Sequence, residues 1–386
     1  NFSLRDPEHY PFNDLFISLV DACNLDCAYC FNKTARKRRL RQRPPTKLQP
    51  QTIIRAMEEF KALGGSGVCF TGGEPTLDPL LLDYCAAGKK IGLATRFITN
   101  GTMLSRLDAA KLVDAVDNFA VSLDTLDQAV ASQLWGVVRF SVRETILYPL
   151  KRVCDTAKAR GRDTFGVTIK PIVASANLNT LQPMVAEVSA LLAGYSVSWD
   201  FSQFEPIGDA GVDQALGISE DTYNKAMVSC VRTLYPEPQP SAADGEGPSD
   251  LDKEHAILRL VLGHGGKVQP RREIKVMPCA PSFFVIGSGD VYPCQELETD
   301  TFRLGNISDT TLREMFHHPA FAALRSKMTV DDVEVCNECE FRYVCGRHCH
   351  GQAQQQFGRT TAYIHGNRDQ CRRRMITQLW LETRGH

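Results

Sequence analysis

The sequence has almost no net charge and no long hydrophobic run, and each absence excludes a class of protein. Its 44 Lys and Arg residues nearly balance its 45 Asp and Glu residues, so no overall field marks it as a binder of nucleic acid or anionic membranes. No apolar run approaches the roughly 20 residues that span a bilayer. The first residues, 1–14, are polar and unlike a signal peptide. A length of 386 residues predicts two to three domains.

Cysteine, by contrast, is abundant: the sequence has 14, in two groups with four single residues between them. Because no export signal is present, we expect a reducing cytoplasm, where clustered thiols bind metal or do redox chemistry more often than they form disulfides. The four single cysteines are expected to behave as small buried apolar residues; they are Cys69, Cys85, Cys154 and Cys230.

Strand and helix patterns alternate through the first half of the sequence. Apolar and β-branched runs predict strands at 15–20, 68–71, 94–99, 119–123, 166–173 and 196–201, and helical periodicity predicts helices that include 51–63, 105–116 and 146–160. This alternation predicts an α/β fold with a parallel sheet, either doubly wound or closed into a barrel. Six strands by about residue 205 are fewer than the eight of a full barrel.

A stretch rich in Pro, Gly, Ser and acidic residues, 236–250, predicts a mobile loop. The second cysteine group begins about 30 residues after this loop, so we place a domain boundary in this region. The predicted organisation is a first domain over 1–210, a linker or bridging region over 211–275 and a cysteine-rich domain over 276–386.

The first cysteine group comes directly after the first predicted strand. Cys23, Cys27 and Cys30 have the spacing Cys-x3-Cys-x2-Cys. Three thiolates on one short loop can hold three corners of a [4Fe–4S] cluster, which leaves one iron open for a substrate or cofactor. A structural zinc site would need a fourth ligand nearby. A zinc knuckle or a set of free thiols is the alternative at this point.

With the aromatic Tyr29 before its last cysteine, this motif resembles the signature of the radical SAM enzymes. In that family the open iron binds S-adenosylmethionine, and one electron from the cluster releases a 5′-deoxyadenosyl radical that abstracts a hydrogen atom from substrate. The resemblance covers about residues 12–210. It implies that the predicted strands form a partial (β/α)6 barrel of the TIM type.

Motifs at the ends of the next three predicted strands also resemble those of the family. The residues at 71–75 match its GGEP motif, whose glycines and glutamate receive the methionine ammonium group. The motif at 99–101 would lie against the cofactor, and the motif at 122–124 resembles the ribose-contacting position; an ordinary turn is the alternative for these two. The implied cofactor-binding residues are Tyr29, Gly72, Gly73, Glu74, Thr99, Asn100, Ser122 and Asp124.

The second cysteine group does not have the spacing of a zinc ribbon. It resembles the SPASM extension of radical SAM enzymes, which carries two auxiliary [4Fe–4S] clusters. The resemblance implies an outer cluster bound by Cys336, Cys339, Cys345 and Cys371, and an inner cluster, nearer the substrate, bound by Cys279, Cys294 and Cys349. With the first site, this makes three [4Fe–4S] clusters.

The inner set has only three cysteines, so it has either an open iron or a ligand of another type. His348, His350 and Glu273 are candidates for that ligand. An open iron could bind substrate, whereas a filled one would only carry electrons.

Asp200 and Glu205 lie near the end of the sixth predicted strand and are candidates for acid–base catalysis, with a structural hydrogen bond as the alternative. The basic run 33–43 is interpreted as a solvated face, or else as a surface that attracts an acidic peptide.

Around residues 339–345 the sequence most resembles maturases of ribosomally synthesised peptides. The implied function is a radical SAM oxidoreductase that oxidatively modifies a peptide, most simply by a carbon–carbon or thioether crosslink. Formylglycine formation, as in sulfatase maturases, peptide epimerisation and small-molecule dehydrogenation are alternatives on the same scaffold. A non-catalytic iron–sulfur electron carrier is the alternative of a different class, but a carrier needs no open iron and no ammonium-binding motif.

The expected partners follow from this function. They are a precursor peptide and an electron donor such as flavodoxin or ferredoxin, with no nucleic acid and no membrane. Only 22 residues precede Cys23, which leaves no room there for a leader-binding domain. We therefore expect a separate leader-recognition protein or recognition by the barrel surface.

Overall fold

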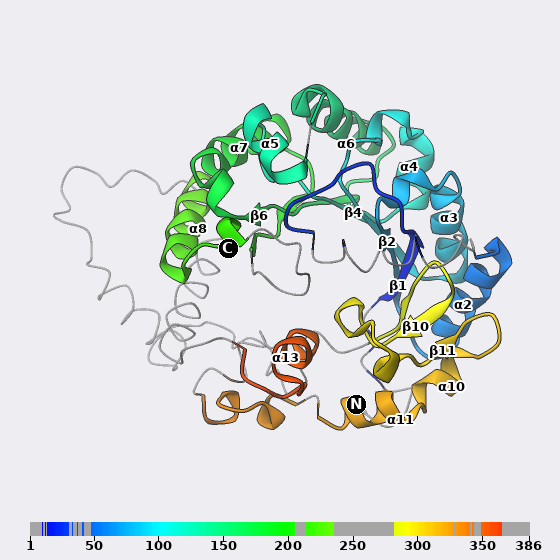
Figure 1. Ribbon diagram of the computed structural model, residues 1–386. Coiled ribbons are helices and arrows are strands. Elements are labelled where there is room, and N and C mark those ends of the chain that lie inside the picture. Colours follow the sequence, from blue (N-terminus) through cyan, green and yellow to red (C-terminus); the bar gives the residue numbers. More distant parts are fainter. Residues whose placement is uncertain are drawn as a thin grey trace, which may run out of the picture.

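The computed structural model describes residues 14–30, 48–136, 138–204, 214–234, 282–327, 329–339 and 349–364, with residues 10, 12, 33, 37, 41 and 342. Its central feature is one curved sheet with helices along the outer face (Figure 1). Within these residues, no helix has the length and apolar character needed to cross a membrane.

From β1 onward, the strands of this sheet run parallel to one another and lie in the order in which they occur in the chain. They are β1 (Leu15–Val20), β2 (Gly67–Gly72), β3 (Ala94–Thr99), β4 (Asn118–Val121), β5 (Gly166–Ile169) and β7 (Val197–Trp199). The predicted parallel α/β sheet is confirmed. The strand predicted over 166–173 is divided, because Pro171 has no N–H for the ladder. Its second part, β6 (Ile172–Val173), pairs with β8 (Ser202–Gln203).

In the part of the chain that the structure describes, helices cover the outer face of the parallel strands (Figure 1). They are α2 (Pro50–Ala62), α3 (Leu81–Ile91), α4 (Ala109–Ala115), α5 (Gln128–Trp135), α6 (Tyr148–Ala159), α7 (Leu178–Leu191) and α8 (Glu220–Leu234). Short turns of helix lie between them: η2 (Pro75–Leu77), η3 (Leu104–Arg106), η4 (Arg143–Leu147), η5 (Ser175–Asn177) and η6 (Gln214–Leu216). The helix predicted over 105–116 starts later as α4, because the Asp108 carboxylate caps it by accepting hydrogen bonds from the N–H groups of Ala110 and Lys111.

The hydrophobic core lies between the sheet and this layer of helices. Alternate residues of β1 face it, so Leu15 and Ile17 are fully buried. Helix α2 begins with Pro50 in its first turn and buries Met57 and Phe60 against the same side. The four single cysteines are also buried, as predicted.

The first part of the predicted linker is a helix of the barrel wall. Helix α8 packs against α7, and the Tyr223 hydroxyl donates a hydrogen bond of 3.0 Å to the carbonyl of Phe201. The predicted domain bounds, 1–210, 211–275 and 276–386, stay a prediction. The loop predicted over 236–250 lies outside the described residues.

A C-terminal hairpin extends the sheet beyond β1. Its strands are β9 (Phe284–Val285), β10 (Asp290–Tyr292) and β11 (Gly305–Asn306), and β9 runs parallel to β1 (Figure 1). Short helices follow, as η7 (Gln295–Leu297), η8 (Asp300–Phe302), α10 (Leu312–Phe316), α11 (Pro319–Arg325), η9 (Val330–Asp332), η10 (Cys336–Glu338) and α13 (His350–Phe357). The Glu59 carboxylate of α2 accepts a hydrogen bond of 2.8 Å from the N–H of Leu312, which fixes α10 to the barrel.

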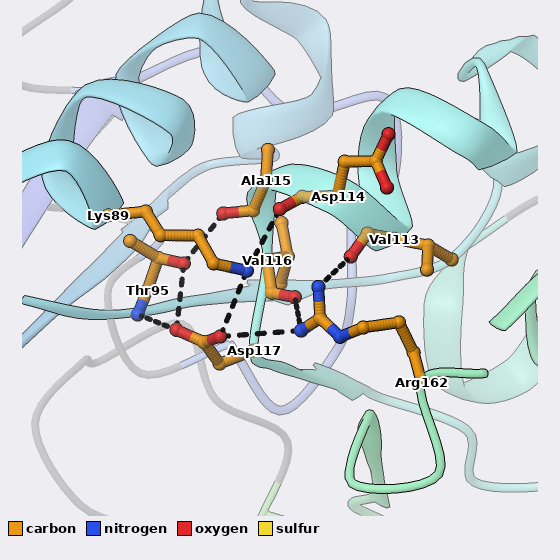
Figure 2. Close-up of polar contacts among 8 residues, drawn as sticks. All are labelled: Lys89, Thr95, Val113, Asp114, Ala115, Val116, Asp117 and Arg162. Carbon is orange, nitrogen blue, oxygen red and sulfur yellow. Dashed lines mark hydrogen bonds and ion pairs between the residues drawn. The ribbon is translucent and has the colours of Figure 1, made fainter. Parts of the chain in front are cut away.

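At the amino end of β4, an aspartate joins several elements of the barrel (Figure 2). The Asp117 carboxylate accepts a hydrogen bond of 3.0 Å from the N–H of Thr95 in β3 and forms ion pairs with Lys89 of α3 and Arg162. Burial alone would raise the pKa of Asp117, but the hydrogen bond from Thr95 and the charge of Lys89 outweigh it and lower the pKa. This network joins elements at the amino ends of the barrel strands, here called the lower end of the barrel; the carboxyl ends are its upper end.

Candidate functional site

The first cysteine group lies on the segment that leaves β1, residues 21–30, here called the cluster loop. Cys23, Cys27 and Cys30 are all partly exposed on it. A turn closes the second half of the loop, because the N–H of Cys30 donates a hydrogen bond of 3.3 Å to the carbonyl of Cys27. The loop is at the carboxyl end of a barrel strand, where barrel enzymes place their active sites.

The glycine motif after β2 holds the start of the cluster loop. The N–H groups of Gly73 and Glu74 donate hydrogen bonds of 2.7 and 2.9 Å to the carbonyls of Val20 and Ala22. A Cβ atom on Gly73 would lie 2.0 Å from the Ala22 carbonyl oxygen, so only glycine fits there. Gly72 has φ +136°, which a residue with a side chain rarely adopts.

The Glu74 side chain joins the end of β2 to the end of β3. It is 1% exposed, and its carboxylate accepts hydrogen bonds from the Thr99 hydroxyl at 2.6 Å and the Asn100 N–H at 2.7 Å. It also accepts one from the N–H of Thr76 at 3.1 Å, which starts the turn η2. The contact of Glu74 with a methionine ammonium group stays a prediction.

The end of β3 holds the first half of the cluster loop. The Asn100 side-chain amide donates a hydrogen bond of 2.9 Å to the Asn24 side-chain oxygen, and its nitrogen lies 3.9 Å from the Cys23 sulfur. The Asn24 amide in turn donates to the Thr102 hydroxyl at 2.7 Å. Asn24 and Thr102 were not predicted from the sequence. Their polar side chains beside two motifs were the only available signal.

Helix α5 holds the second half of the cluster loop. The N–H groups of Asp26 and Ala28 donate hydrogen bonds of 3.1 and 2.8 Å to the carbonyls of Trp135 and Leu134. These carbonyls belong to the last turn of a helix, where they have no partner within the helix. Gly136 then ends the helix with φ +83°. Backbone groups make this contact, so no sequence motif could have indicated it.

Asp124, after β4, is fully buried and accepts three hydrogen bonds. They come from the Tyr29 hydroxyl at 2.5 Å, the Trp135 indole N–H at 2.5 Å and the Ile172 N–H at 2.7 Å. Burial raises the pKa of Asp124, and the hydrogen bonds from Trp135 and Tyr29 only partly offset this rise. The ribose contact predicted for Asp124 has no exposed carboxylate oxygen to make it, whereas Ser122 is partly exposed.

The surroundings of the three thiols favour the binding of a positively charged group such as an iron ion. Burial raises the pKa of Cys27, and negative charge on Asp124, Cys30 and Cys23 raises it further. Thiolate ligands must lose their protons to bind metal, and a bound cationic iron would reverse this effect. Among the described residues, no three His, Cys, Asp or Glu side chains converge on a single ion position. The thiolates of a cubane each bind a different iron, so they need not converge in this way.

The two acid–base candidates have different outcomes. The Asp200 carboxylate, after β7, forms an ion pair with Lys170 after β5, and its side chain is 50% exposed. Both residues follow strands of the parallel sheet, so the pair lies at the same edge of the barrel as the cluster loop. Glu205 lies outside the described residues. A catalytic role for either stays a prediction.

The structure brings two members of the predicted inner set onto neighbouring segments. Cys294 follows β10, and Cys349 caps α13, its sulfur accepting from the Gln352 N–H at 3.5 Å. The Gln355 amide of α13 donates hydrogen bonds of 2.8 and 3.0 Å to the carbonyl and carboxylate of Glu296. These bonds hold the helix that follows one cysteine against the turn that follows the other.

Of the predicted outer set, two cysteines are described. Cys336 begins η10, and Cys339 follows its last residue. The N–H of Cys339 donates a hydrogen bond of 3.0 Å to the carbonyl of Cys336. His350 is buried, and its Nδ1 lies 2.9 Å from the Thr360 carbonyl oxygen. The other predicted ligands lie outside the described residues; they are Cys279, Cys345, Cys371, His348 and Glu273.

Two family models match the chain. The model of the Radical SAM superfamily matches residues 17–173, and the SPASM model, an iron-sulfur cluster-binding domain, matches residues 276–340. The first match contains the whole cluster loop and the strand-end motifs. The second begins before Cys279 and extends past Cys339.

The chain is similar to proteins that act on different substrates. It is 26% identical to the PqqA peptide cyclase of Ruegeria pomeroyi over 330 residues, which cover 84% of this chain and 79% of that protein. It is 37% identical to GTP 3′,8-cyclase 2 of Mycobacterium tuberculosis over 121 residues, which cover 30% of this chain and 32% of that protein. The first similarity thus spans both domains, and the second is confined to about a third of each protein.

Two solved structures share the fold. One is anSMEcpe with bound AdoMet and the Kp18Cys peptide, with a TM-score of 0.63, 18% identity and coverage of 96% of this chain and 99% of that chain. The other is Streptococcus suis SuiB bound to S-adenosylmethionine, with a TM-score of 0.61, 15% identity and coverage of 92% and 76%. With both domain models matched, the chain is a radical SAM enzyme with a C-terminal SPASM domain.

Proposed function

We propose that this enzyme is a peptide maturase, an oxidoreductase that crosslinks a ribosomally synthesised precursor through a carbon–carbon or thioether bond. The observation that carries the proposal is the similarity to a PqqA peptide cyclase, which extends over 84% of the chain and so includes both domains. Two structures with the same fold support it, since one was solved with the Kp18Cys peptide and SuiB was also solved with the precursor peptide SuiA.

The proposed cofactors are S-adenosylmethionine and three [4Fe–4S] clusters. When bound, the first cluster and S-adenosylmethionine supply the radical that abstracts hydrogen from an unreactive carbon. The chain supplies Cys23, Cys27 and Cys30 as ligands, on a loop fixed at both halves. Around the cofactor we place Tyr29, Gly72, Gly73, Glu74, Thr99, Asn100, Ser122 and Asp124, the last two as a direct contact and a supporting residue.

The auxiliary clusters suit an oxidation, because the electron left on a substrate radical needs an acceptor. We assign Cys336, Cys339, Cys345 and Cys371 to the outer cluster, and Cys279, Cys294 and Cys349 to the inner one. The hairpin of the second domain lies beside the first site, since a Cβ on Gly287 between β9 and β10 would lie 4.0 Å from the Asp21 carboxylate.

The proposed partners are the precursor peptide, a separate protein that recognises its leader, and a flavodoxin or ferredoxin as electron donor. A reducing cytoplasm is the proposed location, because exposed cluster thiols would otherwise oxidise. Asp200 is proposed as an acid–base residue at the barrel mouth, where Lys170 pairs with it and half of its side chain is exposed.

The test begins with anaerobic reconstitution of the full chain. Three cubanes predict about 12 iron atoms per chain. Reduction with dithionite in the presence of S-adenosylmethionine should produce 5′-deoxyadenosine. Peptides encoded beside the gene should then lose two hydrogens for each crosslink, as measured by mass spectrometry, and Cys27→Ala should abolish both products.

Other masses would identify the alternatives. An unchanged mass with inverted chirality at one residue would indicate epimerisation, and conversion of Cys or Ser to an aldehyde would indicate formylglycine formation. Either result would overturn the crosslinking proposal. Zinc in place of iron would overturn the cluster assignment as well.

A further inference from the structure

The basic run, residues 33–43, is a strongly charged segment that the proposed function does not use. It has seven Lys and Arg residues among eleven, and no acidic residue occurs in the sequence between Asp26 and Glu58. The whole chain, by contrast, has a formal net charge of −1. So much charge of one sign in one segment produces a strong local field.

The start of this run is tied to the cluster loop. The N–H of Lys33 donates a hydrogen bond of 3.1 Å to the Cys30 carbonyl. The Lys33 ammonium group lies 2.8 Å from the Asp26 carboxylate and donates a hydrogen bond of 3.4 Å to the Asp26 carbonyl. Because its side chain is only 20% exposed, Lys33 acts as an anchor. The run therefore begins directly beside the loop that carries the three cysteines.

Two more basic residues lie on the same side of the run. Lys33, Lys37 and Arg41 are all helical, and residues four apart are neighbours on one helix face. Lys37 also pairs with Asp26, at 3.5 Å, and half of its side chain is exposed. Arg41 is exposed. One carboxylate thus faces two ammonium groups, which leaves an excess of positive charge. The other residues of the run lie outside the described part of the chain.

These residues lie at the outer rim of the barrel mouth. The Asp26 N–H is bound to the last turn of α5, and a Cβ on Gly136, which ends that helix, would lie 3.5 Å from the Asp26 side chain. Helix α5 belongs to the layer on the outer face of the sheet (Figure 1). A substrate must place its reacting carbon against S-adenosylmethionine at the strand ends, whereas an electron donor needs only to come near the cluster. The position therefore favours a donor over a substrate.

We propose that Lys33, Lys37 and Arg41, here called the basic face, form the docking surface for the electron donor, a protein with acidic residues around its redox centre. The donor loses one electron there, and the cluster gains it in passing from its 2+ to its 1+ state, with no bond or proton exchanged. The proposal rests on the proposed function only in that the cluster loop holds a cluster that a protein reduces.

A small charged surface suits a partner that binds briefly and leaves. Electron-transfer complexes have small interfaces, commonly below about 1,200 Å², and complementary charge raises their association rate more than their affinity. Salt weakens such attraction between exposed charges. We therefore expect the basic face to determine how fast the donor reaches the cluster, in a manner that depends on salt.

The experiment uses the full reconstituted chain, with either reduced flavodoxin or dithionite as the reductant. The test variant combines Lys37→Glu with Arg41→Glu, which lowers the run from seven positive charges to a net three. The matched control combines Lys90→Glu with Lys158→Glu, the same change in charge at exposed residues of α3 and α6. A third variant, Lys37→Arg with Arg41→Lys, keeps the charge of the basic face.

The first readout is the rate at which reduced flavodoxin reduces the cluster, measured by absorbance after rapid mixing. At low salt the test variant should react about ten-fold more slowly than the unmodified chain, because it lacks the complementary charge. The control pair and the charge-keeping variant should match the unmodified chain. High salt should remove most of the difference. Dithionite-driven formation of 5′-deoxyadenosine should be the same in all four proteins, because a small reductant needs no docking surface.

The second readout is binding without turnover. Oxidised flavodoxin is titrated into the reconstituted chain at low salt, and calorimetry measures its affinity. The test variant should bind it several-fold more weakly than the unmodified chain, whereas the control pair should bind it equally well.

Three results would overturn the proposal. An unchanged flavodoxin rate and affinity in the test variant would make the run a solvated face. An unchanged flavodoxin rate with a raised KM for the peptide under dithionite would make it a surface for an acidic peptide. An equal loss in the control pair would show an effect of net charge alone.

A further variant covers damage to the cluster loop. If Lys37→Glu disturbs the loop through Asp26, dithionite-driven activity will fall as well. Arg41→Glu alone then decides, since only lysines pair with Asp26 in the described part of the chain, and an unchanged flavodoxin rate in it would overturn the proposal. Failure of the proposed function is distinguishable, because the unmodified chain would then form no 5′-deoxyadenosine with dithionite, or would form it without any peptide product.

Discussion

Strand β4 has an aspartate at each end, and the two differ in almost every physical respect. Asp117, before the strand, is paired with Lys89 and Arg162, and its side chain is 37% exposed. Asp124, after the strand, is fully buried and is bound only by neutral donors. The pKa of the first is lowered by its partners, and that of the second is raised by burial.

The difference shows how one strand serves two purposes. Partners of opposite charge at the lower end stabilise the carboxylate, so Asp117 contributes to folding. At the upper end, burial disfavours the charged form of the Asp124 carboxylate, and three hydrogen bonds compensate part of that cost. Costly buried groups of this kind are typical of functional sites. In barrels the carboxyl end carries function and the amino end carries stability.

The largest expected effect separates these two ends by activity. Cys27→Ala at the upper end should abolish 5′-deoxyadenosine formation and remove about four of the roughly 12 iron atoms. The apparent melting temperature of the barrel should change little, because Cys27 is partly exposed on a loop. Iron analysis and product chromatography measure the outcome. Loss of most of the iron would mean that the C-terminal clusters depend on the first site, and the two ends would not be separable.

The next effect is on stability and belongs to the lower end. Asp117→Ala leaves the Thr95 N–H without its acceptor and should lower the free energy of unfolding by about 2 kcal/mol. 5′-Deoxyadenosine formation per iron-loaded chain should be unchanged. Thermal unfolding measures the first and product analysis the second. The control is Asp114→Ala, one turn away on α4, whose ion pair with Arg160 is exposed and should contribute little.

Acid sensitivity gives a finer test of the same residue. The pKa of Asp117 is lower in the folded chain than its ordinary value of 3.8, so its contribution is complete well above pH 3.8 and is lost as the pH falls through the lowered value. The melting temperatures of the unmodified chain and Asp117→Asn should therefore converge as the pH falls from 5 to 3. A constant difference over this range would show that hydrogen-bond geometry, and not charge, is the contribution of Asp117.

The upper end could be predicted from the sequence only as far as side-chain type and spacing allow. The strand at 15–20, the three cysteines after it and the glycine motif were all predicted, because each is a local pattern. The contacts that fix the cluster loop were not. Asp26 and Ala28 bond through backbone groups to a helix more than 100 residues later, and such groups leave no trace in side-chain type.

Asp124 illustrates the same limit. A polar residue after a strand at a barrel mouth was interpreted as a ligand contact, and nothing in its immediate neighbours indicates that Tyr29, Trp135 and Ile172 all donate to it. The hairpin of β9, β10 and β11 was missed for a related reason. Strands of two or three residues are too short for a periodic pattern, and their pairing with β1 is a long-range choice.

Salt provides the smallest effect and the most direct test of the contrast between charged and neutral partners. Lys89→Met removes an ion pair in which both side chains are 37% exposed, so it should lower stability by about 0.5 kcal/mol or less at low salt. At 1 M salt, screening acts over about 3 Å and the loss should shrink further. Lys90→Met, on the exposed neighbouring residue, removes the same charge as a control.

Trp135→Phe should increase amide hydrogen exchange at the cluster loop, and this increase should not depend on salt, because a buried bond between an indole and a carboxylate is little screened. If both effects fade together with salt, the two aspartates of β4 do not differ in the way that their partners indicate.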